Sequence, residues 1–128
     1  MLALPEPYRT HLPPLLAAAF AEDLPDITST AVFGPEETLR AELVAKQEGV
    51  LCGLPAFAAA YAFLDGGCAV ELAFEDGGRV AGRREAVARV AGRARTVLAA
   101  ERAALNLLMR LSGVATLTRR FLDAVAPT

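Results

Sequence analysis

The sequence predicts a single α+β domain: a small antiparallel sheet with helices packed on one side of it. Its 128 residues are enough to bury one hydrophobic core. The expected strands alternate apolar and polar residues and are separated by glycine-rich turns, as in antiparallel sheets. Strands and helices do not alternate regularly, as a parallel sheet built of βαβ units would require.

The first part of the chain predicts a helix, a loop and a strand. A short helix is expected over residues 12–21, with Pro13-Pro14 in its first turn, where proline is tolerated. Residues 22–37 contain two prolines and a glycine and predict a loop. Residues 39–45 alternate apolar and polar side chains, which is typical of a half-buried strand.

The middle of the chain predicts a second helix and the rest of the sheet. Residues 49–53 form an apolar segment with a glycine at each end, and Pro55 begins a helix that reaches residue 64. Two turns built on glycine pairs, at residues 65–67 and 75–78, then separate the remaining strands. These strands are expected over residues 69–74 and, as one or two strands broken near Gly82, over residues 79–90.

The last part of the chain predicts two helices. A long helix is expected over residues 94–111, and Gly113 is expected to divide it from a final helix that reaches residue 124. We therefore expect one domain over residues 1–112, with residues 113–128 leading out of it.

Composition and charge limit the classes of function that the chain can have. The longest uncharged stretch, residues 49–64, is shorter than the roughly 20 apolar residues of a membrane-spanning helix, so no membrane segment is expected. The net charge of −2 hides an asymmetry, because ten of the thirteen basic residues follow residue 78. That end of the chain should meet an anion. Nucleic acid is not the expected partner, because all ten are arginines and no nucleic-acid-binding motif accompanies them.

Few side chains have the pattern of a metal or catalytic site. Cys52 and Cys68 lack the spacing of a metal site and are expected to be free, buried thiols in a reducing cytoplasm. His11 has no neighbouring acid-base partners and is expected to be an exposed residue at a helix start. The acidic residues Glu22, Asp23 and Asp26 could bind a cation, but a solvated helix end or a loop cap is favoured.

The segment with the most information combines charge with an apolar helical stripe. At about 100° per residue, Leu98, Arg102, Leu105 and Met109 project from nearly the same side of the expected helix. Glu101 points further into this stripe, where an ionised carboxylate needs a partner. We therefore expect Glu101 to be buried and to pair with an arginine, such as Arg95, Arg102 or one from another helix.

Residues 101–125, ERAALNLLMRLSGVATLTRRFLDAV, also resemble a known family. The segment is similar to the end of the amino-terminal domain of nicotinate-nucleotide pyrophosphorylase, also called quinolinate phosphoribosyltransferase (decarboxylating). The resemblance extends upstream, less sharply, through residues 49–53, the Glu75-Asp76-Gly77 turn and Gly82, to Glu22-Asp23. Family members usually place glycines after that Glu-Asp pair, so the loop that contains Leu24-Pro25 is expected to be shorter and stiffer here.

The resemblance implies a reaction of NAD biosynthesis. Enzymes of the family transfer phosphoribose from 5-phosphoribosyl 1-pyrophosphate to quinolinate, with Mg²⁺, and yield nicotinate mononucleotide, pyrophosphate and carbon dioxide. Arg102 matches an arginine that binds quinolinate in the neighbouring subunit, so the resemblance implies at least a homodimer. It implies no catalytic residue and no metal ligand in this chain, because those lie in a carboxy-terminal barrel-like domain that these residues do not include.

Three functions follow from the sequence as alternatives. The favoured one is the amino-terminal part of a quinolinate phosphoribosyltransferase, for which the 128-residue chain alone should be inactive. The second is a related phosphoribosyltransferase that acts on another pyridine carboxylate. The third is a catalytically inert dimerisation or interaction domain. For Arg102, an ion pair with Glu101 or with another helix is compatible with a role in substrate binding.

Overall fold

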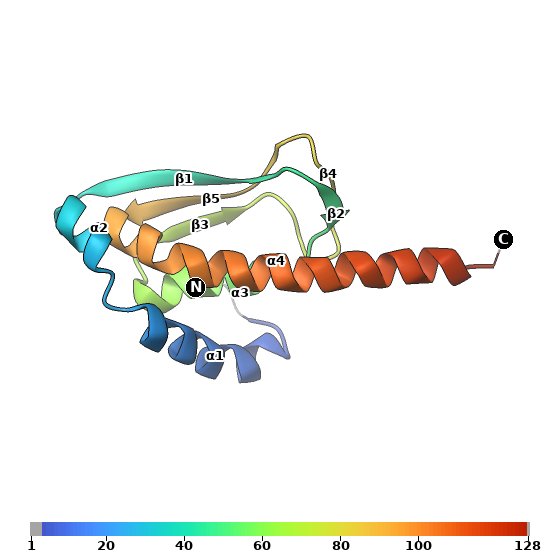
Figure 1. The fold of residues 1–128 in the computed structure, drawn as a ribbon, viewed down its shortest axis with the longest axis horizontal. Coiled ribbons are helices and arrows are strands. Elements are labelled where there is room, and N and C mark those ends of the chain that lie inside the picture. Colours follow the sequence, from blue (N-terminus) through green and yellow to red (C-terminus); the bar gives the residue numbers. More distant parts are fainter. Residues whose placement is uncertain (1–3, 128) are drawn as a thin grey trace.

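The computed structural model describes residues 4–127 and confirms the α+β class. A three-stranded antiparallel sheet lies on one side, and helices α3 (Leu54–Leu64) and α4 (Ala94–Val125) cover its inner face (Figure 1). Helix α1 (Tyr8–Asp23) packs against the other side of these two helices. All helices of the described part therefore lie on one side of the sheet, as the sequence predicts.

The sheet has the strand order β1-β5-β3, with β1 at Thr38–Ala45, β3 at Ala69–Leu72 and β5 at Glu85–Arg93. Both edge strands run antiparallel to β5, with Leu39 opposite Gly92 and Val70 opposite Val90. A bulge between Leu43 and Val44 shifts the register at the end of β1. The sheet thus brings together strands that are distant in sequence, because β2, α3, β3 and β4 lie between β1 and its partner β5 along the chain.

A second, two-stranded sheet lies beside the middle of α4. It consists of β2 (Glu48–Val50) and β4 (Arg79–Ala81), and Figure 1 shows it at the point where α4 leaves the main body. Gly82, at φ 78°, follows β4 and lies so close to the backbone of Gln47 and Glu48 that a Cβ would stand 2.7 Å from it. The break near Gly82 that the sequence predicts is therefore confirmed, with β4 and β5 on either side.

The hydrophobic core lies between the sheet and the helices. Phe57 and Leu54 of α3 and Val87 of β5 are its largest fully buried side chains. Helix α4 contributes mostly alanines, including Ala100 and Ala104, which have no exposed surface. Small side chains on α4 let its backbone lie close to α3 and the sheet, so the position of this helix is fixed by close packing.

Two expectations near the amino terminus are wrong. Helix α1 begins at Tyr8, so Pro13 and Pro14 lie inside it and not in its first turn. Both prolines are exposed, as are Arg9 and Thr10, whose carbonyls lose their helical partners and can bond water instead. The contacts of the buried Leu12, Leu16 and Phe20 with the rest of the core hold the helix in place.

The expected loop of residues 22–37 contains a short helix, α2 (Ile27–Val32). Asp26 caps it, because its Oδ1 accepts a hydrogen bond from the Ser29 amide at 3.1 Å and its Oδ2 one from the Ser29 hydroxyl at 2.6 Å. These bonds lower the pKa of the Asp26 carboxyl. The cap expected for an acidic residue of this loop is confirmed, whereas the helix itself lacks the apolar periodicity that would predict it.

Helix α4 is a single helix of 32 residues, so the expected division at Gly113 is wrong. A glycine inside a helix costs about 1 kcal/mol relative to alanine, which neighbouring turns can offset. The side chains of Ser112 and Thr116, on either side of Gly113, bond residues 50–52, at the end of β2 and just after it, and hold this part of the helix in place. Beyond Thr116 the helix projects away from the domain into solvent (Figure 1).

Candidate functional site on the long helix

Arg102 lies on the outer surface of α4, and its side chain is 76% exposed. The buried side of the helix is instead formed by residues at other helical positions, namely Ala94, Val97, Ala100, Ala103, Ala104 and Leu108. Leu98 and Leu105 are half-buried and Met109 is 60% exposed. The expected apolar stripe is therefore at the edge of the packed surface, and Arg102 faces outward from that edge.

The expectation for Glu101 is wrong. Glu101 is exposed, and it forms no ion pair with any residue of the described range 4–127. Arg95, one of its expected partners, instead donates hydrogen bonds to the carbonyls of Phe33 at 2.7 Å and Thr30 at 3.1 Å, at the end of α2. Glu101 acts at a distance on the buried Tyr61, whose pKa is raised to about 12, mainly by burial and secondly by this charge.

Arg102 pairs with the last residue of α1. Its Nη1 lies 3.4 Å from Oδ1 of Asp23, which confirms the alternative of an ion pair with another helix. At this length and exposure the pair contributes little to stability. A guanidinium has five N–H donors, and the Asp23 contact uses one of them. The fork of Arg102 therefore remains available to a carboxylate that approaches from outside the domain.

The Leu-Ser-Gly-Val-Ala-Thr part of the motif has a structural role. The Ser112 hydroxyl accepts a hydrogen bond from the Cys52 amide at 3.0 Å and lies 3.1 Å from the Cys52 carbonyl. The Thr116 hydroxyl accepts one from the Val50 amide at 2.9 Å. These two side chains bind an extended segment, residues 50–52, along α4. The sequence pattern shows the motif but not this role, because the partners are 60 or more residues away.

The glycines of residues 49–53 allow this segment to approach α4. A Cβ on Gly49 would lie 2.9 Å from the Thr116 hydroxyl, and one on Gly53 would lie 2.8 Å from Cδ1 of Leu111. Gly53 also has φ 100°, which disfavours other residues. The upstream resemblance at residues 49–53 is therefore explained by the same packing that fixes α4.

Asp76, in the Glu75-Asp76-Gly77 turn of the resemblance, has a structural role that the sequence does not indicate. Its Oδ1 accepts hydrogen bonds from the amides of Gly53 and Leu54, at 2.9 Å each, and so caps the start of α3. Its Oδ2 accepts one from the Tyr8 hydroxyl at 2.8 Å. One carboxylate of the 75–78 turn thereby ties α1 to α3. Its place in a glycine turn does not indicate this role, because the start of α3 and Tyr8 are both distant from Asp76 in the sequence.

The remaining sequence candidates do not gather around Arg102. His11 is exposed in the first turn of α1, and Cys52 and Cys68 are free and half-buried. Burial raises the pKa of the Cys68 thiol, and Asp65 adds to this effect. Within residues 4–127, no group of three or more His, Cys, Asp or Glu side chains could hold a metal ion.

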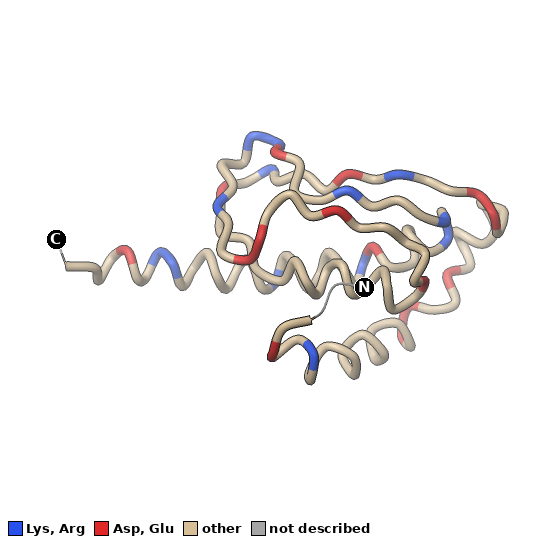
Figure 2. Tube along the Cα trace, turned by 180° about the vertical axis from the view of Figure 1, so that it is seen from behind, with Lys and Arg blue, Asp and Glu red and all other residues tan. Residues whose placement is uncertain are grey.

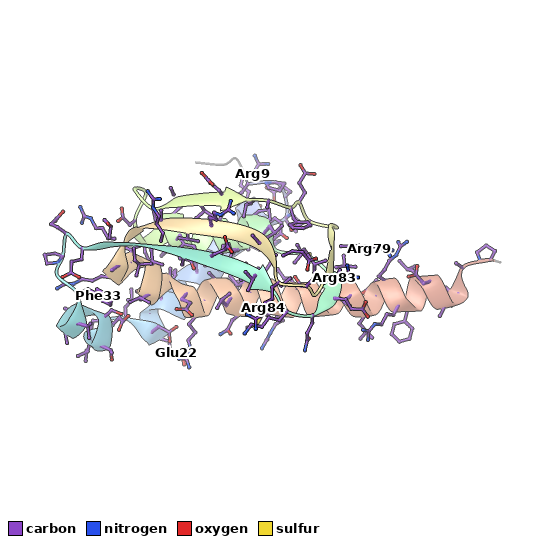
Figure 3. The ribbon with its side chains drawn as sticks, turned by 90° about the horizontal axis from the view of Figure 1, so that it is seen from above. Arg9, Glu22, Phe33, Arg79, Arg83 and Arg84 are labelled. Atoms are coloured by element: carbon purple, nitrogen blue, oxygen red, sulfur yellow. The ribbon has the colours of Figure 1, made fainter. Side chains whose placement is uncertain are left out.

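The charged residues are distributed unevenly in space as well as in sequence. Most acidic residues lie on α1, on the loops and on the strands, whereas arginines gather around the turn between β4 and β5 and recur along α4, which also carries Glu101 and Asp123 (Figure 2). In Figure 3 the side chains of Arg79, Arg83 and Arg84 extend from β4 and the turn that follows it, near the middle of α4 and away from Glu22. Arg79 of β4 lines the same pocket as Arg119 and Arg120 of the projecting part of the helix, together with the acidic residues Glu48 and Asp123.

An apolar cavity lies within the described part, and Arg102 does not line it. The cavity, of about 420 Å³, lies between α1, α3 and β3. Its lining contains no charged side chain and includes Leu12, Leu16, Pro55, Phe63 and Val70. A dianion would lose its hydration in such a cavity without gaining a cation. Arg102 is thus a cation presented on the surface and not part of a closed pocket of this domain.

Among the described residues no helix is both long and apolar enough to cross a lipid bilayer. 

Comparison with known proteins gives a consistent family. Residues 26–112 match the family described as quinolinate phosphoribosyl transferase, N-terminal domain. The chain is 39% identical over 111 residues to a probable nicotinate-nucleotide pyrophosphorylase [carboxylating] of Bacillus subtilis, covering 85% of this chain and 38% of that protein. It is 32% identical over 107 residues to quinolinate phosphoribosyltransferase [decarboxylating] 1b of Nicotiana tabacum, covering 84% of this chain and 30% of that protein.

Solved structures agree with these relatives. The crystal structure of NadC from Streptococcus pyogenes has a TM-score of 0.82 and 33% identity, covering 88% of this chain and 41% of that chain. The nicotinate-nucleotide pyrophosphorylase from Francisella tularensis has a TM-score of 0.80 and 26% identity, covering 88% and 40%. The chain thus spans about a third of the length of the curated relatives. It belongs to the family of quinolinate phosphoribosyl transferase amino-terminal domains.

Proposed function

We propose that this chain supplies the amino-terminal domain of an enzyme that joins quinolinate to 5-phosphoribosyl 1-pyrophosphate and yields nicotinate mononucleotide, pyrophosphate and carbon dioxide in NAD biosynthesis. The names of the relatives and the family match support this proposal. The observation that carries it is the position of Arg102 in the family motif, on an exposed face of α4 with most of its donors free.

In this proposal Arg102 binds a carboxylate of quinolinate in the active site of the neighbouring subunit. Quinolinate is a dianion, and a planar guanidinium can hold one of its carboxylates with two parallel hydrogen bonds. Arg102 stays charged at any relevant pH, so this contact orients the substrate without a proton transfer. Its exposure on a helix surface suits a residue that acts on another subunit, because it cannot close a pocket in its own domain.

The proposal includes a homodimer or larger assembly, Mg²⁺ and a cytoplasmic location. The apolar side chains of Val114, Leu117, Phe121 and Val125 are all more than half exposed on the last third of α4, which supports an interface there. Mg²⁺, if bound with the phosphoribosyl donor, would be held by carboxylates outside this chain, where it would neutralise charge on the pyrophosphate. The two free thiols suit a reducing compartment.

The proposal is tested on a complete enzyme in which this chain is joined to the remaining carboxy-terminal part of the Bacillus subtilis relative. Arg102→Ala should lower kcat/KM for quinolinate by about tenfold to a hundredfold, which corresponds to one charge-assisted contact of roughly 1.5–3 kcal/mol. Binding of the phosphoribosyl donor should change much less. Arg89→Ala is the matched control, because Arg89 is also exposed and also pairs with one carboxylate, that of Glu42.

Two further measurements separate the alternatives. The 128-residue chain alone should form no nicotinate mononucleotide, and turnover by the purified chain would overturn the proposal. A related enzyme for another pyridine carboxylate would instead show a higher kcat/KM for nicotinate than for quinolinate. An inert interaction domain would assemble but give an inactive fusion, whether or not Arg102 is present.

A mixed dimer tests whether Arg102 acts across the interface. One subunit carries Arg102→Ala and the other carries a defect in its carboxy-terminal domain. If Arg102 acts on its neighbour, one site combines both defects and the other has neither, so activity should be near half of the parent. If Arg102 acts within its own subunit, each site has one defect and little activity remains.

A further inference from the structure

The ion pair between Asp23 and Arg102 is not explained by stability. Asp23 is the last residue of α1, and an acidic side chain is unfavourable there because the carbonyl end of a helix carries partial negative charge. Its Oδ1 lies 3.4 Å from Nη1 of Arg102, whose side chain is largely exposed. A pair of this length and exposure contributes little to the free energy of unfolding. The carboxylate therefore lies at an unfavourable position without a gain in stability.

The two partners differ in how firmly they are held. The side chain of Asp23 is only 25% exposed. It follows by three residues the buried Phe20, whose ring stacks on that of Phe63 of α3 with the ring centres 5.6 Å apart. The Leu24 amide bonds the Phe20 carbonyl at 2.9 Å and closes the same turn of α1. Arg102, in contrast, projects a long and flexible side chain from the surface of α4. A fixed carboxylate thus contacts a flexible guanidinium.

The contact occupies one end of the guanidinium and leaves another edge free. Asp23 bonds Nη1 of Arg102, whereas Nε and Nη2 form the edge on the other side of the same plane. Neither Nε nor Nη2 has a hydrogen-bond acceptor among residues 4–127. That edge presents two parallel N–H donors, which is the geometry that a carboxylate needs for two hydrogen bonds. The ion pair is therefore compatible with a second, bidentate partner.

We propose that Asp23 is a positioning residue, which orients Arg102 so that its free edge faces the quinolinate of the neighbouring subunit. This inference rests on the proposed function, in which Arg102 binds a quinolinate carboxylate. A flexible arginine loses side-chain freedom when it binds, and this loss lowers affinity. Because Asp23 restricts Arg102 before the substrate arrives, less freedom is lost on binding. Asp23 itself does not touch the substrate.

Asp23→Asn in the complete enzyme keeps the size of the side chain and removes its charge. The KM for quinolinate should rise by about threefold to tenfold, the range expected when one more side chain must be ordered on binding. The kcat and the KM for the phosphoribosyl donor should stay nearly unchanged, because the lost effect concerns only the binding of quinolinate. The Tm of the 128-residue chain should not fall, since the pair adds little stability.

Two comparisons test whether the effect passes through Arg102. Glu22→Gln removes the same charge one residue earlier on α1, and the exposed Glu22 forms no ion pair with any residue that the structure describes. This control should leave the KM for quinolinate at the value of the parent. In an Arg102→Ala background, Asp23→Asn should cause no further rise in KM, because the side chain that it orients is gone.

The outcomes distinguish this inference from the proposed function. An unchanged KM in Asp23→Asn, in an enzyme whose quinolinate efficiency Arg102→Ala still reduces, would overturn the positioning role alone. A lower KM would overturn it too, because Asp23 would then compete with the substrate for Arg102. The same holds for a rise that Glu22→Gln reproduces, that persists in full without Arg102, or that accompanies a fall in Tm. An Arg102→Ala enzyme with unaltered quinolinate kinetics would overturn the proposed function as well.

Discussion

The bond between Thr116 and residue 50 allows a sharp test of how α4 is held. Thr116→Val keeps the size and branching of the side chain but removes the hydroxyl that accepts the Val50 amide at 2.9 Å. The bond is part-buried, and without the hydroxyl the amide would lose this acceptor. A donor left unsatisfied in this way costs about 1–3 kcal/mol of unfolding free energy. For a domain of this size that corresponds to a fall in Tm of roughly 3–12 °C.

Thr118→Val is the control for this substitution. Thr118 lies two residues further along the same helix, is exposed, and bonds only the Val114 carbonyl of its own helix, at 2.8 Å. The two variants have the same change in helix propensity and in side-chain chemistry. Their difference therefore measures the bond to residue 50.

Urea unfolding followed by circular dichroism gives the free energies, and a thermal scan gives the Tm. Thr116→Val should be less stable than Thr118→Val by at least about 1 kcal/mol, with an unchanged dependence on urea concentration. Equal stability of the two variants would refute the reasoning, because the Val50 amide would then be satisfied without Thr116.

Four further outcomes are expected. Asp76→Ala removes the cap of α3 and the bond from Tyr8, so it should lower the unfolding free energy by about 1–2 kcal/mol, more than Tyr8→Phe, in urea titrations of both. Gly53→Ala forces a side chain into φ 100° beside Leu111 and should destabilise the chain by more than about 1 kcal/mol, whereas Gly66→Ala should not. Glu101→Ala should change stability by less than about 0.5 kcal/mol, since the carboxylate is exposed; a larger loss of Tm would show a partner for it. The pKa of Asp26 is lowered in the folded state, so its contribution to the free energy of unfolding is present above its ordinary pKa and is lost as the pH falls through the folded pKa. Asp26→Ala should therefore make the free energy of unfolding less dependent on pH in this acidic range, as measured by urea titrations at several pH values.

The sequence by itself determined the elements whose signals are local. Glycine pairs placed the turns, Pro55 placed the start of α3, and alternation placed β1, because these effects depend on the backbone of a few neighbouring residues. The same holds for the position of Arg102, which a contiguous motif reveals. The family and its fold could therefore be predicted before any contact was known.

Tertiary structure decided which side of α4 is buried. Hydropathy favoured the line of Leu98, Leu105 and Met109, yet the helix packs through alanines such as Ala100 and Ala104. Small side chains give a weak hydropathy signal but let two backbones approach closely, and dispersion contacts grow with that closeness. Because α4 packs through its alanines, Glu101 and Arg102 lie on the solvent-exposed side, which the hydropathy pattern alone could not show.

The continuity of α4 was decided in the same way. Gly113 indicates a break when only local propensity is counted, but Ser112 and Thr116 bond residues 50–52 from either side of it. The bonds of Asp76 to α3 and to Tyr8 are likewise set by partners that are distant along the chain. Such contacts depend on how separate elements come together in the fold, and no short stretch of sequence contains both the donor and the acceptor.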